Sequence, residues 1–234
     1  MKFIHILIWT ILISTQAHAF DPGQIISDAI RSYEQVKDYT CLFYKKELVQ
    51  EKYVEQKNII MKHRKPSSFY LKWTEADEKG TEVIYVQGRN DNKLKAHTAG
   101  ALKWLTLNLD PGGSVAMKNN RHTVLDVHIG KIIDICDKNY TLAKQLNVGT
   151  FELCEERRIG GEPKICIKAT FPDDRRFYGA IIYIYVHKEF KFPVAVEIYG
   201  WNNELLEKYE YTNVKLNVGL TDKDFDPKNK EYEF

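Results

Sequence analysis

The chain has 234 residues, of which 34 are Lys or Arg and 32 are Asp or Glu, so its formal net charge is only +2. Binding of nucleic acid needs a concentrated basic surface, and because none stands out, nucleic acid is not expected as a partner. Hydrophobic residues make up 44% of the chain and aromatic residues 12%. This composition excludes a disordered tail and indicates a folded chain with a large core.

The chain begins with the pattern of a cleavable signal peptide over residues 1–19. One basic residue precedes an apolar run from Phe3 to Ile13, and polar residues then lead to a small-residue motif that ends at Ala19. A membrane-spanning helix needs about 20 apolar residues, roughly twice this run. We therefore predict cleavage between Ala19 and Phe20, a mature chain without a transmembrane anchor, and a periplasmic or secreted location. An uncleaved anchor is the alternative.

Removing 19 residues from 234 leaves 215, which suits one β-rich domain, and we predict a single domain over residues 20–234. Its first segment, 25–36, repeats apolar residues at three- and four-residue spacing, which indicates a helix that Asp21 caps. Five segments rich in β-branched and aromatic residues follow and predict an antiparallel meander. They are 40–49, 54–63, 68–74, 81–87 and 92–97.

The middle of the chain differs from both flanks. Turn-forming residues predict an irregular excursion over 102–121, and apolar spacing then indicates a helix over roughly 123–137, with another turn or two within 140–147. Strand character returns in 149–158, 163–171, 177–187, 193–200 and 205–215. Two helices cannot cover ten strands on both sides. We therefore expect an α+β fold, mostly antiparallel β, in which a curved sheet wraps around the helices.

One hairpin can be assigned in register. Folding residues 151–169 about the loop 159–161 pairs residues whose numbers sum to 320. This register places Cys154 opposite Cys166 and groups three opposite-charge pairs on the same face. The charge pairs are Glu152–Lys168, Glu156–Lys164 and Arg158–Glu162. Directly opposite cysteines lie within bridging distance, so we predict a Cys154–Cys166 disulfide in an oxidising compartment.

The two remaining cysteines would then form a Cys41–Cys136 disulfide by elimination. Four cysteines permit three pairings, and two free thiols or a bridge formed elsewhere are the alternatives. No Cys-x-x-Cys spacing exists, so no metal site is expected.

The sequence contains no recognisable catalytic or cofactor-binding motif. The histidines of the mature chain fall in none of the spacings that metal sites use, and Ser114 lacks the second glycine of a nucleophile elbow. Three alternating aspartates between Thr221 and Pro227 lack the later Gly and Glu of a calcium loop. We predict that the protein is not an enzyme and that it needs no cofactor.

Two sets of strands alternate apolar and polar side chains, so one face of the sheet is strongly hydrophobic. An ordinary core packed on the helices explains this pattern. The sharper interpretation is a cleft between sheet and helices that is open to an acyl chain or a similar ligand. The residues predicted to line this cleft are Ile59, Met61, Phe69, Leu71, Trp73, Ile182, Ile184, Val194 and Val196.

Several stretches resemble an uncharacterised bacterial secreted family, domain of unknown function 1571, over about residues 25–234. They are Pro66 to Trp73, Gly80 to Gly88, Leu109 to Pro111 with Asn120-Arg121, Ala195 to Trp201, and Asp224 to Phe234. That family is similar in architecture to the periplasmic lipoprotein carriers LolA and LolB. The resemblance implies an incomplete β-barrel around helices, with an apolar cavity for acyl chains. By chain position, Arg121 is the candidate for the arginine that regulates the carrier.

A resemblance of fold leaves function open, so acyl-chain carriage is an analogy. The first hypothesis is a periplasmic protein that binds a hydrophobic ligand, a lipid or lipoprotein acyl chain, in the concave face of its sheet. The second is a cell-envelope structural or interaction module with a closed core, whose loop 102–121 or edge strand contacts another envelope protein.

Overall fold

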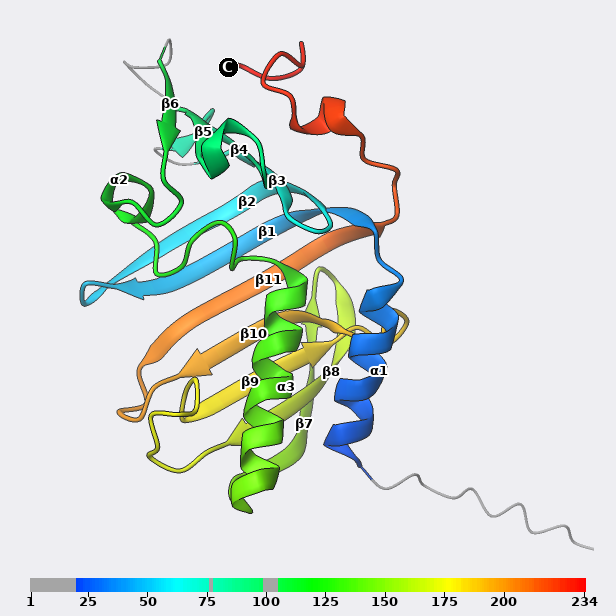
Figure 1. Cartoon of the computed structure of the whole chain (residues 1–234). Helices are drawn as coiled ribbons and strands as arrows, with labels where there is room; N and C mark the ends of the chain where they lie inside the picture. The colour runs from blue at the N-terminus through cyan, green and yellow to red at the C-terminus, as the bar shows by residue number, and fades with distance from the viewer. Residues whose placement is uncertain (1–19, 76–77, 99–104) are drawn as a thin grey trace, which may run out of the picture.

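The computed structural model describes residues 20–75, 78–98 and 105–234. The predicted signal peptide, which ends at Ala19, lies outside the described residues. Eleven strands form one antiparallel sheet in the order β6-β5-β4-β3-β2-β1-β11-β10-β9-β8-β7 (Figure 1). The sheet curves around two helices and is not closed. This confirms the predicted fold class of a curved, open antiparallel sheet with helices.

Two meanders meet at the centre of the sheet. The N-terminal meander contains β1 (Asp38–Val49), β2 (Lys52–Arg64), β3 (Ser68–Trp73), β4 (Glu82–Val86), β5 (Leu94–His97) and β6 (Thr106–Leu109). The C-terminal meander contains β7 (Thr150–Ile159), β8 (Glu162–Thr170), β9 (Ile181–Val186), β10 (Pro193–Tyr199) and β11 (Leu205–Leu216). The first and last strands, β1 and β11, pair antiparallel and join the two halves.

Helix α1 (Pro22–Glu34) begins as its sequence predicts. Asp21 Oδ1 accepts a hydrogen bond from the backbone N–H of Gly23 at 2.9 Å, and Pro22 occupies the first helical position, where it has no N–H to satisfy. Helix α3 (Ile129–Leu146) is a single helix that ends at Asn147, which has a left-handed φ of 52°. The predicted helix over 123–137 and the turns within 140–147 are therefore one element, which begins later than expected.

The late start of α3 has a local cause. The Thr123 hydroxyl donates to Asp126 at 2.8 Å and holds residues 123–126 in a turn, so the apolar spacing there does not continue as a helix. The predicted excursion also contains regular structure that its turn-formers concealed, namely β6 and the short helix α2 (Ser114–Met117).

Helices α1 and α3 lie side by side over the concave face of the C-terminal meander (Figure 1). Gly130 allows this close approach, because a Cβ atom there would lie 2.7 Å from Cε1 of Tyr33 on α1. The buried stripe of α3 packs with inward side chains of β8 to β11 in one hydrophobic cluster. Its members include Ile129, Ile132, Ile133, Cys136 and Ala143 of α3.

The convex face of β2 to β4 is covered by the C-terminal segment 219–234, which includes the 3-10 helix η4 (Asp222–Phe225). Phe225 is buried against Ile84, and Tyr232 stacks on Tyr70 with ring centroids 4.1 Å apart. An ion pair between Lys62 and Asp224 at 3.0 Å adds to this attachment. Phe225 and Tyr232 therefore attach the C-terminal segment to the sheet.

The β7–β8 hairpin contains the Cys154–Cys166 disulfide, with Cα atoms 5.1 Å apart. The predicted register holds from the base of the hairpin to these cysteines, and Lys168 contacts Glu152 at 2.8 Å. A bulge after Cys154 then shifts the pairing, so that Ile159 faces Glu162.

The expected pairs Glu156–Lys164 and Arg158–Glu162 are consequently wrong. The structure favours a two-residue turn, because Gly160 and Gly161 have φ values of 61° and 83°, which suit such a turn. The shift also buries the Ile159 side chain.

The predicted Cys41–Cys136 disulfide is not formed. Both cysteines are free thiols, buried in the main hydrophobic cluster. The prediction rested on elimination and not on a register that faces the two side chains. A buried thiol packs as a small hydrophobic group and needs no partner.

Candidate functional site: an apolar cavity with a buried ionic border

An apolar cavity of about 100 Å³ lies between the concave face of the N-terminal meander and residues 110–127, here called the covering segment. The strands contribute Phe43, Ile59, Leu71, Trp73, Val83, Leu94, Ala96 and Leu109 to its lining. The covering segment contributes Pro111, Ala116, Val124 and Val127 among others. The cavity exists because this half of the sheet faces a segment with few apolar side chains to insert.

The covering segment satisfies its polar groups largely within itself. The amide of Gly112 donates to Asp110 Oδ1 at 2.9 Å, and the Asn120 side chain donates to the carbonyl of Ala116 at 2.7 Å. Its only helix has four residues, and Val115 on that helix is 63% exposed. A segment of this kind covers the sheet without filling it.

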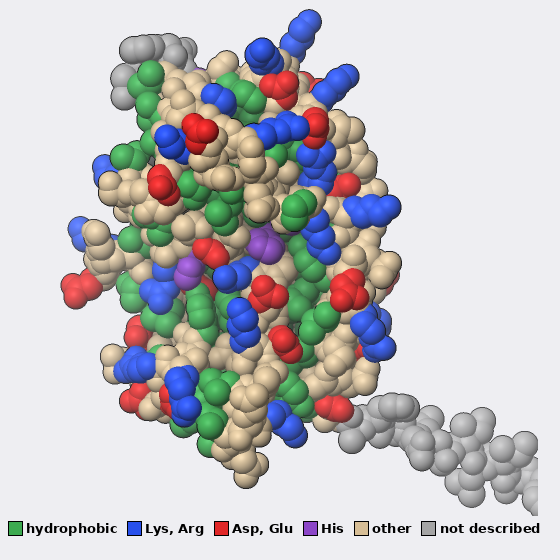
Figure 2. All heavy atoms as spheres, in the orientation of Figure 1, with side chains coloured by type: hydrophobic (Ala, Val, Ile, Leu, Met, Phe, Trp, Pro, Cys, Tyr) green, Lys and Arg blue, Asp and Glu red, His purple; other side chains and the backbone are tan. Residues whose placement is uncertain are grey.

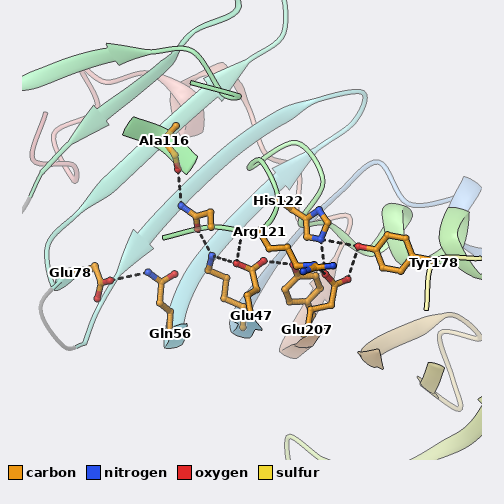
Figure 3. A network of polar contacts seen from close by, with 11 residues as sticks. Glu47, Gln56, Glu78, Ala116, Arg121, His122, Tyr178 and Glu207 are labelled. Atoms are coloured by element: carbon orange, nitrogen blue, oxygen red, sulfur yellow. Dashed lines mark hydrogen bonds and ion pairs between the residues drawn. The ribbon is translucent and has the colours of Figure 1, made fainter. Parts of the chain in front are cut away.

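The cavity borders on two buried carboxylates that face each other across the central strand pair. Glu47 of β1 lies opposite Glu207 of β11, and they are 0% and 1% exposed. Like charges in directly opposite positions destabilise a sheet unless cations compensate them. The surrounding residues supply this compensation (Figure 3).

The first carboxylate, Glu47, is satisfied from three sides. Lys45 Nζ lies 3.0 Å from its Oε2 atom, the backbone N–H of Arg121 donates to the same atom at 3.0 Å, and the Tyr209 hydroxyl donates to Oε1. Burial alone would raise the pKa of Glu47, but these partners outweigh it and hold the pKa below its usual value. Burial lowers the pKa of Lys45, which also donates to Asn120.

The second carboxylate, Glu207, binds the covering segment to the C-terminal half. His122 Nε2 lies 2.6 Å from Glu207 Oε2, and Arg121 Nε lies 3.4 Å from the same oxygen. The Tyr178 hydroxyl donates to Glu207 Oε1 at 2.9 Å. Figure 3 shows Arg121 in contact with both carboxylates, through its backbone N–H to Glu47 and its side chain to Glu207, whereas His122 contacts Glu207 alone. Arg121, the candidate by chain position, is therefore an attachment point of the covering segment.

A second hollow lies on the other side of His122. It has a volume of about 140 Å³ and is lined by α3, β10 and β11, with Ile132, Ile135 and Ile198 on its apolar side and Glu207 on its polar side. His122 lines both cavities, so the ionic border separates them.

The structure distributes the nine predicted ligand-binding residues over two environments. Ile59, Leu71 and Trp73 line the first cavity, and Val196 lines the second. The other five lie in packed hydrophobic clusters and line neither cavity; they are Met61, Phe69, Ile182, Ile184 and Val194. The indole N–H of Trp73 is buried and has no hydrogen-bond partner.

The ionic border was missed in the sequence, although a signal for it exists. Tyr39, Cys41 and Phe43 alternate as inward residues, and continuing the same period places Lys45 and Glu47 on the inner face. Charged side chains at inward positions of a strand indicate a buried ion pair or a site. The opposite carboxylate is Glu207 of β11. The local sequence does not indicate that β1 and β11 pair.

Among residues 20–75, 78–98 and 105–234, no group of three or more His, Cys, Asp or Glu side chains is placed to hold a metal ion. In the same ranges, no helix is both long and apolar enough to span a membrane.

Comparison with known families gives one match to the sequence. A family described as "Protein of unknown function (DUF1571)" matches residues 36–234. A comparison with curated proteins found no match.

Solved structures similar to this chain share little sequence with it. The lipoprotein LppX of Mycobacterium tuberculosis is 13% identical with a TM-score of 0.49, over 88% of this chain and 100% of that one. A LolA superfamily protein from Nitrosomonas europaea is 13% identical with a TM-score of 0.36, over 89% and 98%. The MucA/MucB complex of Pseudomonas aeruginosa is 9% identical with a TM-score of 0.45. That match spans 88% of this chain but only 61% of the other chain.

Proposed function

The chain belongs to the DUF1571 family of proteins of unknown function, and we propose that it is a non-enzymatic, exported protein that binds a hydrophobic ligand. The ligand class is a lipid or a lipoprotein acyl chain, held between the N-terminal meander and the covering segment. The observation that carries this proposal is the apolar cavity on the concave face, to which Ile59, Leu71 and Trp73 contribute.

The size of the cavity defines what binding requires. Ligand pockets usually measure about 300–1,000 Å³, whereas this cavity measures about 100 Å³. It accommodates the end of an acyl chain, and a longer ligand requires the covering segment to move away from the sheet. The segment suits such movement because its attachment to the sheet includes the polar contacts of Asn120, Arg121 and His122 as well as a few apolar side chains.

Export is part of the proposal. The signal-peptide pattern over residues 1–19 supports it. The Cys154–Cys166 disulfide in the β7–β8 hairpin supports it as well, because disulfides persist in oxidising compartments such as the periplasm.

Titration of the delipidated mature protein, residues 20–234, with a fluorescent fatty acid tests the proposal, together with native mass spectrometry of the protein as purified. We expect saturable uptake and a co-purified lipid mass. Trp73→Glu places a charge in the cavity wall and should reduce the affinity at least about tenfold, since an unpaired charge in an apolar pocket is strongly disfavoured.

Val115→Glu is the matched control, because it adds the same charge to the exposed side of α2. It should bind like the unmodified protein, and circular dichroism should show that both variants fold. Absence of saturable uptake, or equal affinities for the two variants, would contradict binding in this cavity.

One observation favours the alternative of an envelope interaction module with a closed core. Five of the nine predicted ligand residues are packed in the core, and the C-terminal half of the concave face is filled by helices. This alternative predicts no lipid uptake and a partner whose capture from envelope extracts depends on the covering segment. Deleting residues 112–119 and comparing the captured proteins distinguishes the two functions.

A further inference from the structure

A groove that shares no lining residue with the apolar cavity has no part in the proposed acyl-chain site. It measures about 590 Å³ and lies where α1, the start of α3 and the β2–β3 connection meet. Ile30, Tyr33, Pro66 and Ile133 form its apolar surface, and His63 and His128 line it as well. Figure 2 shows that hydrophobic side chains, in green, reach the surface between charged ones on the face that carries α1 and α3.

The two imidazoles are unusual because three of their four ring nitrogens are buried without a partner. Neither nitrogen of His63 has a hydrogen bond, and Nδ1 of His128 has none either. His63 is only 1% exposed. A buried polar atom without a partner costs stability, so three such atoms in adjacent side chains call for a functional explanation.

The geometry holds the two rings in place. They stack with centroids 5.1 Å apart and an angle of 6° between their planes. Tyr39 and Phe69 pack against His63 with ring centroids at 5.1 and 4.7 Å. His128 precedes the first residue of α3 and makes no side-chain cap bond to the helix. The nitrogens are therefore not used by the fold.

The surroundings define the charge of the ligand. Burial lowers the pKa of His63 to about 3 and that of His128 to about 4, so both rings are uncharged at neutral pH. Glu34 and Asp134 line the same groove and disfavour an anion. The Lys65 ammonium already donates to the Tyr33 carbonyl at 2.5 Å and lies over the Tyr33 ring.

A metal ion does not fit this arrangement. Ligand lone pairs lie in the plane of an imidazole, and two nearly parallel stacked rings do not direct them at one point. The described part of the chain also offers no third metal-ligating side chain at this position. What the pair does offer is an uncharged donor and acceptor on each ring, which is the complement of a hydroxyl group.

We propose that the groove between α1, α3 and the β2–β3 connection is a second binding site, for an uncharged ligand that carries two hydroxyl groups on an apolar body. One hydroxyl group hydrogen-bonds to each imidazole, of His63 and of His128, and the apolar body lies on Ile30, Pro66 and Ile133. An acylglycerol and a free polyol both supply the hydroxyl chemistry. Only the former supplies the apolar body.

The test is a titration of the mature protein, ¹⁵N-labelled on histidine, followed by NMR of the imidazole nitrogens. Monodecanoylglycerol, glycerol, decanoic acid and decylamine are compared below the concentrations at which they form micelles. Saturable shifts of the His63 and His128 signals with monodecanoylglycerol support the site. Similar affinity for glycerol would identify a polyol ligand, and tighter binding of decanoic acid or decylamine would overturn the assignment of an uncharged ligand.

The variant His63→Phe separates binding from structure. It keeps an aromatic ring in the stack and removes both unpartnered nitrogens, so the melting temperature should stay equal or rise while the affinity for monodecanoylglycerol falls at least about tenfold. His97→Phe is the matched control, since His97 is 4% exposed on another strand and does not line the groove. Unchanged affinity in His63→Phe, or no shift with any probe, would show that the nitrogens meet only a trapped water and would overturn the proposal.

Discussion

The two halves of the sheet carry the same alternation of apolar and polar side chains, yet they enclose different interiors. The C-terminal meander faces α1 and α3, and inward residues such as Ile182 and Val194 are about 1% exposed in a packed core, with the second hollow confined to its border beside His122. The N-terminal meander faces the covering segment, and Val83 and Leu109 border a cavity. Strand alternation thus identifies the face, whereas the covering element decides whether that face becomes core or cavity.

The difference lies in the sequence of the cover. Helix α3 presents a buried, mainly apolar stripe that includes Ile129, Ile132 and Ile133, and it packs against the strands. The covering segment contains Gly112, Gly113 and paired asparagines, so it follows the sheet with short side chains and internal hydrogen bonds. A cavity is the physical result of the second arrangement.

The largest expected effect comes from truncating one side chain in each half. Ile182→Ala removes three carbons from the filled core and should lower the free energy of unfolding by about 2–5 kcal/mol. Leu109→Ala removes the same number from the cavity wall, where they are partly exposed, and should cost about 1 kcal/mol or less. Urea denaturation of both variants measures this contrast. Equal losses would show that the two halves are packed alike.

Acid should destabilise the fold at the groove that His63 and His128 line. Their folded pKa values, about 3 and about 4, are below the ordinary value of 6.5. The unfolded chain therefore takes up protons first, so this stability is present above pH 6.5 and is lost as the pH falls toward these values. By pH 5 each buried imidazole should cost on the order of 2 kcal/mol.

Urea denaturation between pH 7.5 and pH 5 measures this loss. His63→Phe carries one titrating imidazole fewer and should lose about half as much of the stability that the pair contributes. A pH dependence identical to that of the unmodified protein would show that His63 is already protonated or solvated in the folded state.

The smallest expected effect concerns the attachment of the covering segment. Arg121→Gln removes the cation that lies 3.4 Å from Glu207 and leaves two opposed carboxylates with less compensation. Because the Arg121 side chain is one-third exposed, the loss should be about 1 kcal/mol. Hydrogen exchange should quicken in residues 110–127 and stay unchanged in α3. Equal protection of both regions would mean that the segment is not held by this ion pair.

Local patterns in the sequence predict much of this molecule. Asp21 and Pro22 specify the start of α1, and period-two alternation specifies the inner faces of β2, β3, β9 and β10. The facing of Cys154 and Cys166 follows from charge pairing at the base of one hairpin. In each case the interacting residues are close in the sequence, so their spacing carries the information.

The features that escape prediction depend on distant contacts. Glu47 and Glu207 face each other because the first and last strands pair. No local spacing in the sequence predicts that pairing. The bulge after Cys154 is favoured by burial of Ile159 against a strand that follows later in the chain. The cavity itself reflects side chains that are missing from its cover, and the sequence pattern of the strands does not reveal that.

The position of β1 beside β11 also determines how such a chain assembles. Each meander pairs neighbours in the sequence, so each is built from hairpins that close short loops. The seam between Tyr39 and Leu216 joins residues from opposite ends of the chain, and closing it carries the largest loop entropy in the sheet. Until the last strand pairs with it, β1 therefore keeps one free edge, and the sheet is complete only when β11 has formed.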